Sequence, residues 1–488
     1  MTDNLSLLKS RLARIARLRE ATALLEWDMQ TYMPPGAVSA RAEQTATLTQ
    51  LTHEMLTAEE TGALLAKSEA DTAGADADSD EARLLRVLRR EYDRATKLPA
   101  DLVAELARHV ALSQDIWQRA RAASDFAAFA PALEKMIALA RRMAGYLGYK
   151  DHIYDALLDI YEPGARQADV AAMFAEMKPH LIALTRAIAA SAHPVDDGLL
   201  HGNFPIERQK TLTLRAVQAL GYDLQRGRQD EAPHPFCTSF SRDDVRITTR
   251  FDAGYLAQAL YASLHEAGHG LYEQGLPPEY EATPLGDAAS LGIHESQSRL
   301  WENLVGRSRP FCAFLFPLLQ EAFPDAFAQI EPEAYYRAIN KVAPSFIRVE
   351  ADEVTYNLHI LLRFELECDL LTGRLAVSDL PAAWNAKMQA YLGITPPNDA
   401  QGVLQDVHWS GGLIGYFPTY SIGNLVSGQL WHAAGQALQD RDAQIARGEF
   451  APLLGWLRQN VHRYGRKYLP SELIEKATGE PLTSRYYV

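Results

Sequence analysis

Two histidines four residues apart, with a glutamate beside the first, are the residues of this sequence best suited to chemistry. Residues 265–269 read His-Glu-Ala-Gly-His, an H-E-x-x-H pattern. Residues four apart share one face of an α-helix, so both imidazoles can bind one metal ion. Glu266 lies about 100° around the helix, where its carboxylate can accept a proton from water. The motif predicts a metal-dependent hydrolase; the alternative is an amphipathic helix with two unrelated histidines.

The elements that must position this motif follow from the surrounding pattern. We expect a helix from about Tyr255 to Glu273, with Asp252 as its N-cap and Gly275 at its end. The two histidines and Glu266 lie opposite an apolar stripe, as on a helix that lines a cleft or on a solvated face. The stripe comprises Leu256, Leu260, Leu264, Ala267 and Leu271.

A catalytic zinc site needs a third protein ligand besides two histidines. Glu295 is the leading candidate, because the chain between it and His269 is long enough for a loop and a second helix that packs back. His294 is the competing ligand. Glutamates nearer in sequence lie at the end of the first helix or in a proline-rich loop, namely Glu273, Glu279 and Glu281.

Composition narrows the class of protein. The 488 residues carry a formal net charge of −14, which disfavours non-specific binding to nucleic acid. The three cysteines, Cys237, Cys312 and Cys368, are odd in number and far apart, so a disulfide framework is not expected. The amino-acid sequence shows neither the pattern of a signal peptide nor an apolar run of about 18 residues. We therefore expect a cytoplasmic protein that does not enter a membrane.

Helical periodicity dominates the chain and predicts a mainly α fold. The clearest strand is 245–251, and 236–240 is expected to pair with it. We predict a single large helical domain, with a helical part at about 1–195, a metal-site part at about 230–430 and C-terminal helices at about 431–488. Expected helices span about 4–30, 37–65, 81–94, 100–122, 126–147, 167–192, 295–307, 351–371 and 422–438.

Several segments in a fixed order resemble one family, the metallocarboxypeptidases of the thermostable carboxypeptidase Taq type, or M32 family. The H-E-x-x-H motif is one of them, and the others extend from near residue 25 to beyond residue 400. The matching segments are 25–28, 33–37, His234-Pro-Phe, 244–248 (DxRxT), 294–299 (HESQSR), 347–353 (IRxxADE) and 402–409 (GxxQDxHW).

The resemblance implies an almost wholly helical fold with a deep active-site groove and a homodimer. It further implies one zinc ion per chain, for which cobalt or manganese can substitute, and the removal of C-terminal residues from peptides. It assigns His265, His269 and Glu295 as metal ligands and Glu266 as the catalytic carboxylate. His234 becomes a substrate-binding candidate through its short motif.

A carboxypeptidase needs a cation that binds the free carboxylate of its substrate, and arginine offers a charged two-pronged donor. Arg348 is the first choice. If the helix near Asp352 begins early, Arg348, Asp352 and Tyr356 share one face and contribute to substrate binding. A plain Arg348–Asp352 surface pair is the alternative. Arg246 is the other anchor candidate, on a strand face whose polar residues could equally mark an edge strand.

Catalysis also needs a donor for the oxyanion of the tetrahedral intermediate. His408 and Tyr420 are the two candidates, and the sequence does not choose between them. Asp352 or Asp406 can hydrogen-bond the second nitrogen of a ligand histidine. Each of these residues is also compatible with a buried structural role.

The sequence thus predicts a metal-dependent carboxypeptidase that acts on peptides with a free C-terminus. Metal-activated water attacks the last peptide carbonyl, and Glu266 is the general base. The rival activities on the same fold are an endo-acting oligopeptidase and a dipeptidyl carboxypeptidase. A non-catalytic peptide-binding protein is a more distant alternative.

Overall fold

The structure is a computed structural model that describes residues 3–488. Met1 and Thr2 lie outside the described residues. The expectation that the N-terminal segment is not a signal peptide falls partly on them. The chain forms two compact units. Unit 1 comprises Met1–Thr96, Asp196–Ile339 and Val426–Leu482, and unit 2 comprises Lys97–Val195, Asn340–Leu425 and Thr483–Val488. The single domain with three parts stays a prediction.

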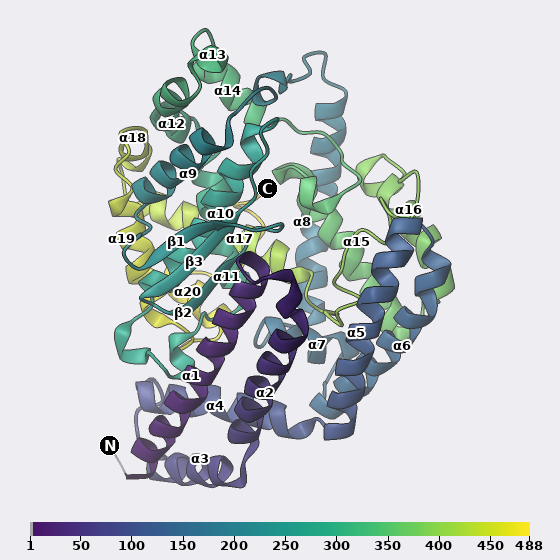
Figure 1. Ribbon diagram of the computed structural model, residues 1–488, viewed down its shortest axis with the longest axis vertical. Coiled ribbons are helices and arrows are strands. Elements are labelled where there is room, and N and C mark those ends of the chain that lie inside the picture. Colours follow the sequence, from purple (N-terminus) through teal and green to yellow (C-terminus); the bar gives the residue numbers. More distant parts are fainter. Residues whose placement is uncertain (1–2) are drawn as a thin grey trace. The chain divides into compact units, whose positions relative to one another are not determined.

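Unit 1 combines helices with a small sheet, which confirms the expected mainly helical class (Figure 1). Its helices are α1 Asp3–Thr31, α2 Val38–Thr57, α3 Glu59–Asp71, α4 Asp80–Lys97, α9 Ile206–Leu220, α10 Leu256–Gly275, α11 Leu291–Arg299, α12 Arg309–Ala322, α13 Pro324–Phe327, α14 Pro332–Ile339, α18 Arg441–Ala446, α19 Ala451–Asn460 and α20 Pro470–Thr478.

Unit 2 is built from helices and connecting segments. Its helices are α5 Ala100–Ala123, α6 Phe126–Leu147, α7 Ile153–Tyr161, α8 Gln167–Ala189, α15 Glu353–Thr372 and α16 Leu380–Leu392, and the residues of α17 Pro418–Ala437 are divided between the two units. Strong periodicity located α6 at its observed bounds. Shorter helices such as α7, α9 and α12 were not predicted.

One expected helix, 37–65, is two helices in the structure. The backbone at Ala58 is extended, with φ −56° and ψ 145°, and it ends α2 and precedes α3. Glu59 and Glu60 occupy the first turn of α3. Negative charge is favourable there because the N-terminal end of a helix carries a partial positive charge. The periodicity continued across the break and concealed it.

The sheet of unit 1 has three strands, β1 Gly227–Glu231, β2 Cys237–Ser241 and β3 Asp244–Thr249, in the order β1-β3-β2. β2 pairs with β3, as predicted, and the two strands run antiparallel. β1 runs parallel to β3 and was not predicted. Val245 and Ile247 are fully buried, as expected for β-branched residues on the covered face of a strand.

The metal-motif helix α10 packs against β3 and α11. All five residues of its predicted apolar stripe are buried, which confirms that face. The bounds agree closely with the expected ones, but the N-cap is Tyr255 rather than Asp252. The side chain of Asp252 instead accepts a hydrogen bond from the backbone of Gly254. It closes a short turn before the helix begins.

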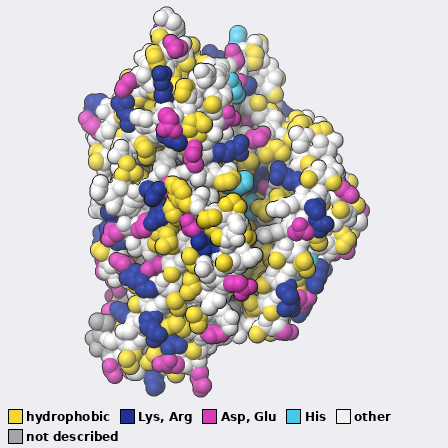
Figure 2. Space-filling model, in the orientation of Figure 1, with side chains coloured by type: hydrophobic (Ala, Val, Ile, Leu, Met, Phe, Trp, Pro, Cys, Tyr) yellow, Lys and Arg dark blue, Asp and Glu magenta, His cyan; other side chains and the backbone are white. Residues whose placement is uncertain are grey.

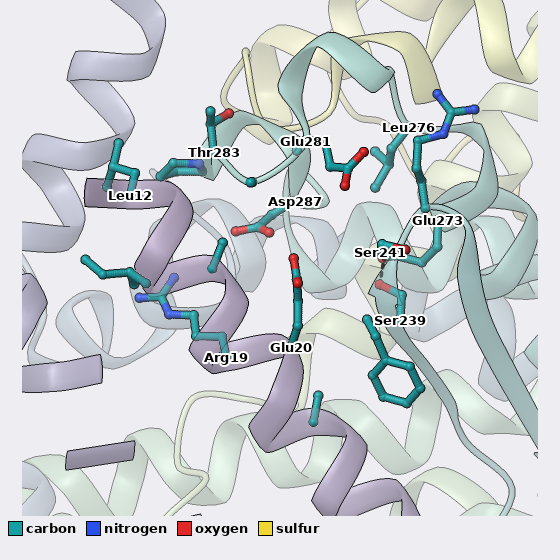
Figure 3. Close-up of a pocket in the computed structure, with 18 of the residues that line it drawn as sticks. Leu12, Arg19, Glu20, Ser239, Ser241, Glu273, Leu276, Glu281, Thr283 and Asp287 are labelled. Carbon is teal, nitrogen blue, oxygen red and sulfur yellow. Dashed lines mark hydrogen bonds between the residues drawn. The ribbon is translucent and has the colours of Figure 1, made fainter. Parts of the chain in front are cut away.

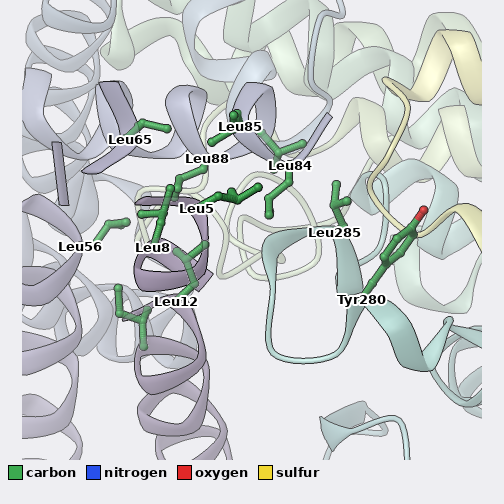
Figure 4. Close-up of a cluster of buried hydrophobic side chains, with 12 residues drawn as sticks. Leu5, Leu8, Leu12, Leu56, Leu65, Leu84, Leu85, Leu88, Tyr280 and Leu285 are labelled. Carbon is green, nitrogen blue, oxygen red and sulfur yellow. The ribbon is translucent and has the colours of Figure 1, made fainter. Parts of the chain in front are cut away.

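A cluster of buried hydrophobic residues in unit 1 holds α1 against α3, α4 and the loop after α10 (Figure 4). Its buried members include Leu5, Leu8 and Leu12, which recur on one face of α1 at helical spacing. Leu84 and Leu88 of α4 contribute in the same way. Burial of such side chains contributes about 1.5–3 kcal/mol each and ties the N-terminal helices to the loop that leads into α11.

Charged residues of both signs are interspersed on the molecular surface in view (Figure 2). Among the described residues, no helix is both long and apolar enough to cross a membrane. The three cysteines are all free, in agreement with the expected absence of a disulfide framework. The cytoplasmic location stays a prediction.

Candidate metal centre

His265, His269 and Glu295 come together in unit 1. Each offers one ligand atom, and these atoms all lie within 4.8 Å of one another. Oε2 of Glu295 is 3.9 Å from His265 Nε2 and 3.6 Å from His269 Nε2. Two imidazole nitrogens and one carboxylate oxygen form a donor set that suits zinc and leaves room for a water molecule. The residues present therefore fit the predicted metal.

Glu295 reaches the histidines because α11 approaches α10 very closely at Gly268. A Cβ atom at position 268 would lie 2.6 Å from Ser298 Cα and 2.7 Å from the carbonyl oxygen of Gln297. Only glycine allows backbone contact of this kind. The second x of H-E-x-x-H must therefore be glycine in this protein, because the two helices contact each other there, although the motif allows any residue. Ser290 caps the start of α11 by accepting a hydrogen bond from the backbone of Ile293.

The side chain of Glu295 is held in place by an arginine. Arg299 Nε donates to Glu295 Oε1 at 2.7 Å. This bond occupies one carboxylate oxygen and leaves Oε2 facing the two histidines. The arrangement favours a single oxygen ligand from Glu295.

A carboxylate that was not predicted holds His265. Nδ1 of His265 lies 2.8 Å from Glu302 Oε2, so Nε2 is directed toward Glu295. Glu302 lies in a π-helical segment, Leu300–Val305, that continues α11. Such segments often occur at functional sites because they rotate side chains out of the α-helical register. The expected helix 295–307 is therefore α-helical only to Arg299.

His294, the competing ligand, has another place in the structure. Its Nδ1 is 2.5 Å from His269 Nδ1, and its Nε2 is 2.8 Å from Glu273 Oε1. Both ring nitrogens are engaged, which favours Glu295 as the third ligand. The prediction that Asp352 or Asp406 bonds a ligand histidine is wrong, because Glu302 and His294 occupy the second nitrogens.

Burial and neighbouring charges shift the pKa values of the site. Burial lowers the pKa of His265, but Glu295 and Glu302 outweigh this effect and raise it to about 9. Burial, together with Glu295 and Glu302, raises the pKa of Glu266 to about 7 against the opposing effect of His265. A carboxyl group that titrates near neutrality can both accept and return a proton.

Arg246 is already paired within unit 1. Its Nε and Nη2 donate to the two carboxylate oxygens of Asp244 at 2.8 and 2.9 Å. The guanidinium also lies 4.3 Å from the ring centre of Trp27. Thr248, two residues further along the same strand face, is fully buried and accepts a hydrogen bond from the backbone N–H of Phe236. Asp244, Arg246 and Thr248 therefore do not form a continuous polar row. His234 is exposed between β1 and β2.

Arg348 lies in unit 2, in a short 3-10 turn before α15. Its Nε donates to Asp406 Oδ1 at 2.9 Å, and Nη1 donates to the hydroxyl of Tyr356 at 2.9 Å. Arg363 Nε donates to the other oxygen of Asp406 at 2.7 Å. Asp352 instead caps α15, with Oδ1 accepting from the backbone of residues 354 and 355. The early helix start and the Arg348–Asp352 pair are therefore both wrong.

His408 and Tyr420, the two oxyanion candidates, are neighbours in unit 2. Nε2 of His408 is 3.2 Å from the hydroxyl of Tyr420. Burial lowers the pKa of His408 to about 4, although Asp406 opposes the effect. The imidazole is thus neutral near pH 7. The geometry joins the two candidates and does not select one.

Sequence reasoning missed the groups that orient the ligands, above all Glu302. One signal was present, because Glu295, Arg299 and Glu302 follow the 0, 4, 7 spacing of a helical face. Glu273 carried a similar signal, because it follows His269 by four residues and so lies on the same face of α10.

The mainly helical fold and the His-His-Glu donor set define a metallopeptidase of the H-E-x-x-H class. The model of the Carboxypeptidase Taq (M32) metallopeptidase family matches residues 7–488. The chain belongs to this family. The predicted family and the predicted class of enzyme, a metallocarboxypeptidase, are both confirmed.

Full-length relatives agree with this assignment. Thermostable carboxypeptidase 1 of Thermus thermophilus is 43% identical over 483 residues, which cover 97% of this chain and 94% of that protein. Carboxypeptidase 1 of Bacillus subtilis is 40% identical over 477 residues, covering 98% and 95%. The solved structure of Pyrococcus furiosus carboxypeptidase matches with a TM-score of 0.97 at 38% identity and covers 100% of this chain and 98% of that one.

Proposed function

We propose that this metallocarboxypeptidase uses one zinc ion, held by His265, His269 and Glu295, to release single residues from the C-termini of peptides. The observation that carries the proposal is the convergence of the three ligand atoms within 4.8 Å. A bound zinc ion would polarise the scissile carbonyl and acidify a water molecule. Cobalt or manganese would fit the same donors.

Glu266 is the proton carrier of the proposed reaction. Its carboxylate accepts a proton from the attacking water and returns it to the nitrogen of the departing amino acid. Burial, with a pKa raised to about 7, supports both roles, because the carboxyl group can exist in either form near neutral pH.

Arg348 is the proposed anchor for the terminal carboxylate of the substrate. It shares Asp406 with Arg363, so two cations face one anion and the cluster carries a net charge of +1. Such an excess favours a second carboxylate. Arg246, by contrast, already has both prongs on Asp244. Tyr356 steadies the Arg348 guanidinium.

His408 and Tyr420 are the proposed donors to the oxyanion, acting as a hydrogen-bonded pair. The neutral imidazole can keep the phenol oriented for donation. His234 remains a substrate-binding candidate on its motif alone. The homodimer rests on the family resemblance and is checked by light scattering.

Mass spectrometry of peptide digests tests the reaction. Purified protein with added zinc is incubated with a peptide and with the same peptide amidated at its C-terminus. Stepwise loss of single residues from the free peptide alone is expected. Equal cleavage of the two forms, at internal bonds, would establish the oligopeptidase alternative, and release of dipeptides would establish the dipeptidyl alternative.

A further inference from the structure

A chain of hydrogen bonds runs from strand β2 to a metal ligand within unit 1. Ser239 Oγ donates to Glu273 Oε2 at 2.9 Å, and Glu273 Oε1 lies 2.8 Å from His294 Nε2. His294 Nδ1 in turn lies 2.5 Å from His269 Nδ1. Figure 3 shows Ser239 and Glu273 joined at the wall of a cavity of about 240 Å³.

The carboxylate of Glu273 determines how the protons along this chain are arranged. The Glu273 carboxylate accepts a hydrogen bond from Ser239, and it accepts a second one from a proton on His294 Nε2. In this tautomer of His294, Nδ1 presents a lone pair. His269 must therefore carry its proton on Nδ1, which leaves the lone pair of its Nε2 facing Glu295. That lone pair is the one a metal ion needs.

We propose that His294 and Glu273 are positioning residues that keep His269 in its metal-binding tautomer. The inference rests on the proposed metal-dependent function and deepens its metal site. Glu302 fixes the tautomer of His265 in the same way, through a direct hydrogen bond. His269 needs two residues, because the ring of His294 lies between it and Glu273.

Two neighbouring residues of helix α11 consequently lie at the site and have different roles. Glu295 supplies a ligand atom, and His294, one position earlier, holds the ligand histidine from behind. The side chains of His294, Glu273 and His269 are 20%, 16% and 14% exposed. Water therefore replaces these bonds poorly when one member is removed.

The test measures zinc affinity of the full chain by competition with a chromogenic chelator. His294→Ala and Glu273→Leu are each expected to weaken zinc binding roughly 10–100-fold, as loss of a group behind a metal ligand usually does. His294→Gln should restore most of the affinity, because its amide can accept from His269 and donate to Glu273. Ser239→Ala should change affinity less than the other variants, since it lies farthest from the metal.

Glu279→Leu is the matched control, because Glu279 is exposed just beyond α10 and lies outside the chain of bonds. The absorption bands of the cobalt-loaded protein give a second readout, which is expected to shift in His294→Ala and return in His294→Gln. Far-UV circular dichroism checks folding. Glu273→Leu, at the cavity wall, carries the test if His294→Ala does not fold.

Wild-type affinity and an unchanged cobalt spectrum in both His294→Ala and Glu273→Leu would overturn the inference. The proposed function has a separate failure, namely a wild-type protein that binds no zinc. If the wild-type protein binds zinc and releases C-terminal residues, and the variants bind zinc equally well, only the proposed positioning role of His294 and Glu273 is refuted.

Discussion

Nδ1 of His265 lies 2.8 Å from Oε2 of Glu302, and this contact directs the other ring nitrogen of His265 toward Glu295. The contact depends on the π-helical segment that follows α11. Burial would raise the pKa of Glu302, but Arg299 and His265 hold it at about 2. His265, a proposed metal ligand, therefore faces a permanent negative charge, which makes its imidazole a stronger electron-pair donor to a metal ion.

Replacement of Glu266 by Gln separates proton transfer from metal binding. The amide keeps the shape of the side chain but cannot accept a proton, so kcat should fall roughly 10²–10⁴-fold. The zinc content, measured by elemental mass spectrometry, should equal that of the wild type, because Glu266 is not among the proposed ligands. Turnover at the wild-type rate would disprove its role as the base.

Replacement of Gly268 by Ala should push α11 away from α10. The added methyl group meets backbone atoms of Gln297 and Ser298, which cannot move independently of the helix. We expect a loss of about 1–3 kcal/mol in the free energy of unfolding, measured in urea, together with weaker zinc binding.

Gly455→Ala is the control for this helix crossing. Gly455 lies inside α19, and a Cβ atom there meets nothing within 4 Å. Alanine at this position should stabilise the protein by about 0.5–1 kcal/mol. If both variants behaved alike, close packing at Gly268 would not be the reason for its glycine.

Arg348→Gln and Arg246→Gln distinguish the two candidate anchors. Loss of a hydrogen bond to a charged group costs about 1.5–3 kcal/mol, so Arg348→Gln should raise KM for free-carboxyl peptides roughly 10–150-fold. The preference for free over amidated peptides should shrink equally. Arg246→Gln should leave that preference intact, and the reverse pattern would move the anchor to Arg246.

The buried Glu367 of unit 2 should make stability depend on pH. It accepts hydrogen bonds from Tyr154, Trp409 and the backbone of Gly415. Burial is the main cause that raises its pKa from 4.5 to about 7. Between these values the folded protein binds more protons than the unfolded chain. The contribution of Glu367 to stability is thus complete below pH 4.5 and lost as the pH rises to about 7.

Urea unfolding of the metal-free protein between about pH 4.5 and 8 measures this dependence. Glu367→Gln cannot titrate, so its free energy of unfolding should vary less with pH than that of the wild type. An identical pH dependence in the two proteins would show that Glu367 has an ordinary pKa.

Long periodic elements were predictable because their signal is local. Helix α6 was located at its observed bounds, and α10 within a few residues, since an apolar stripe repeats along each. The break at Ala58 and the π-helical turn at Glu302 were missed. Both depend on backbone angles at single positions, and the side-chain pattern continues through them.

The sequence by itself identified the family and pointed to His265, His269 and Glu295 as the proposed metal ligands. Spacing of four places His265 and His269 on one helical face, and the need for a third ligand pointed to Glu295. Only the tertiary structure decided which groups hold those ligands, because the partners of a hydrogen bond come from separate elements that packing brings together. It assigned Glu302 to His265 and His294 to His269, and it paired Arg246 with Asp244 and Arg348 with Asp406.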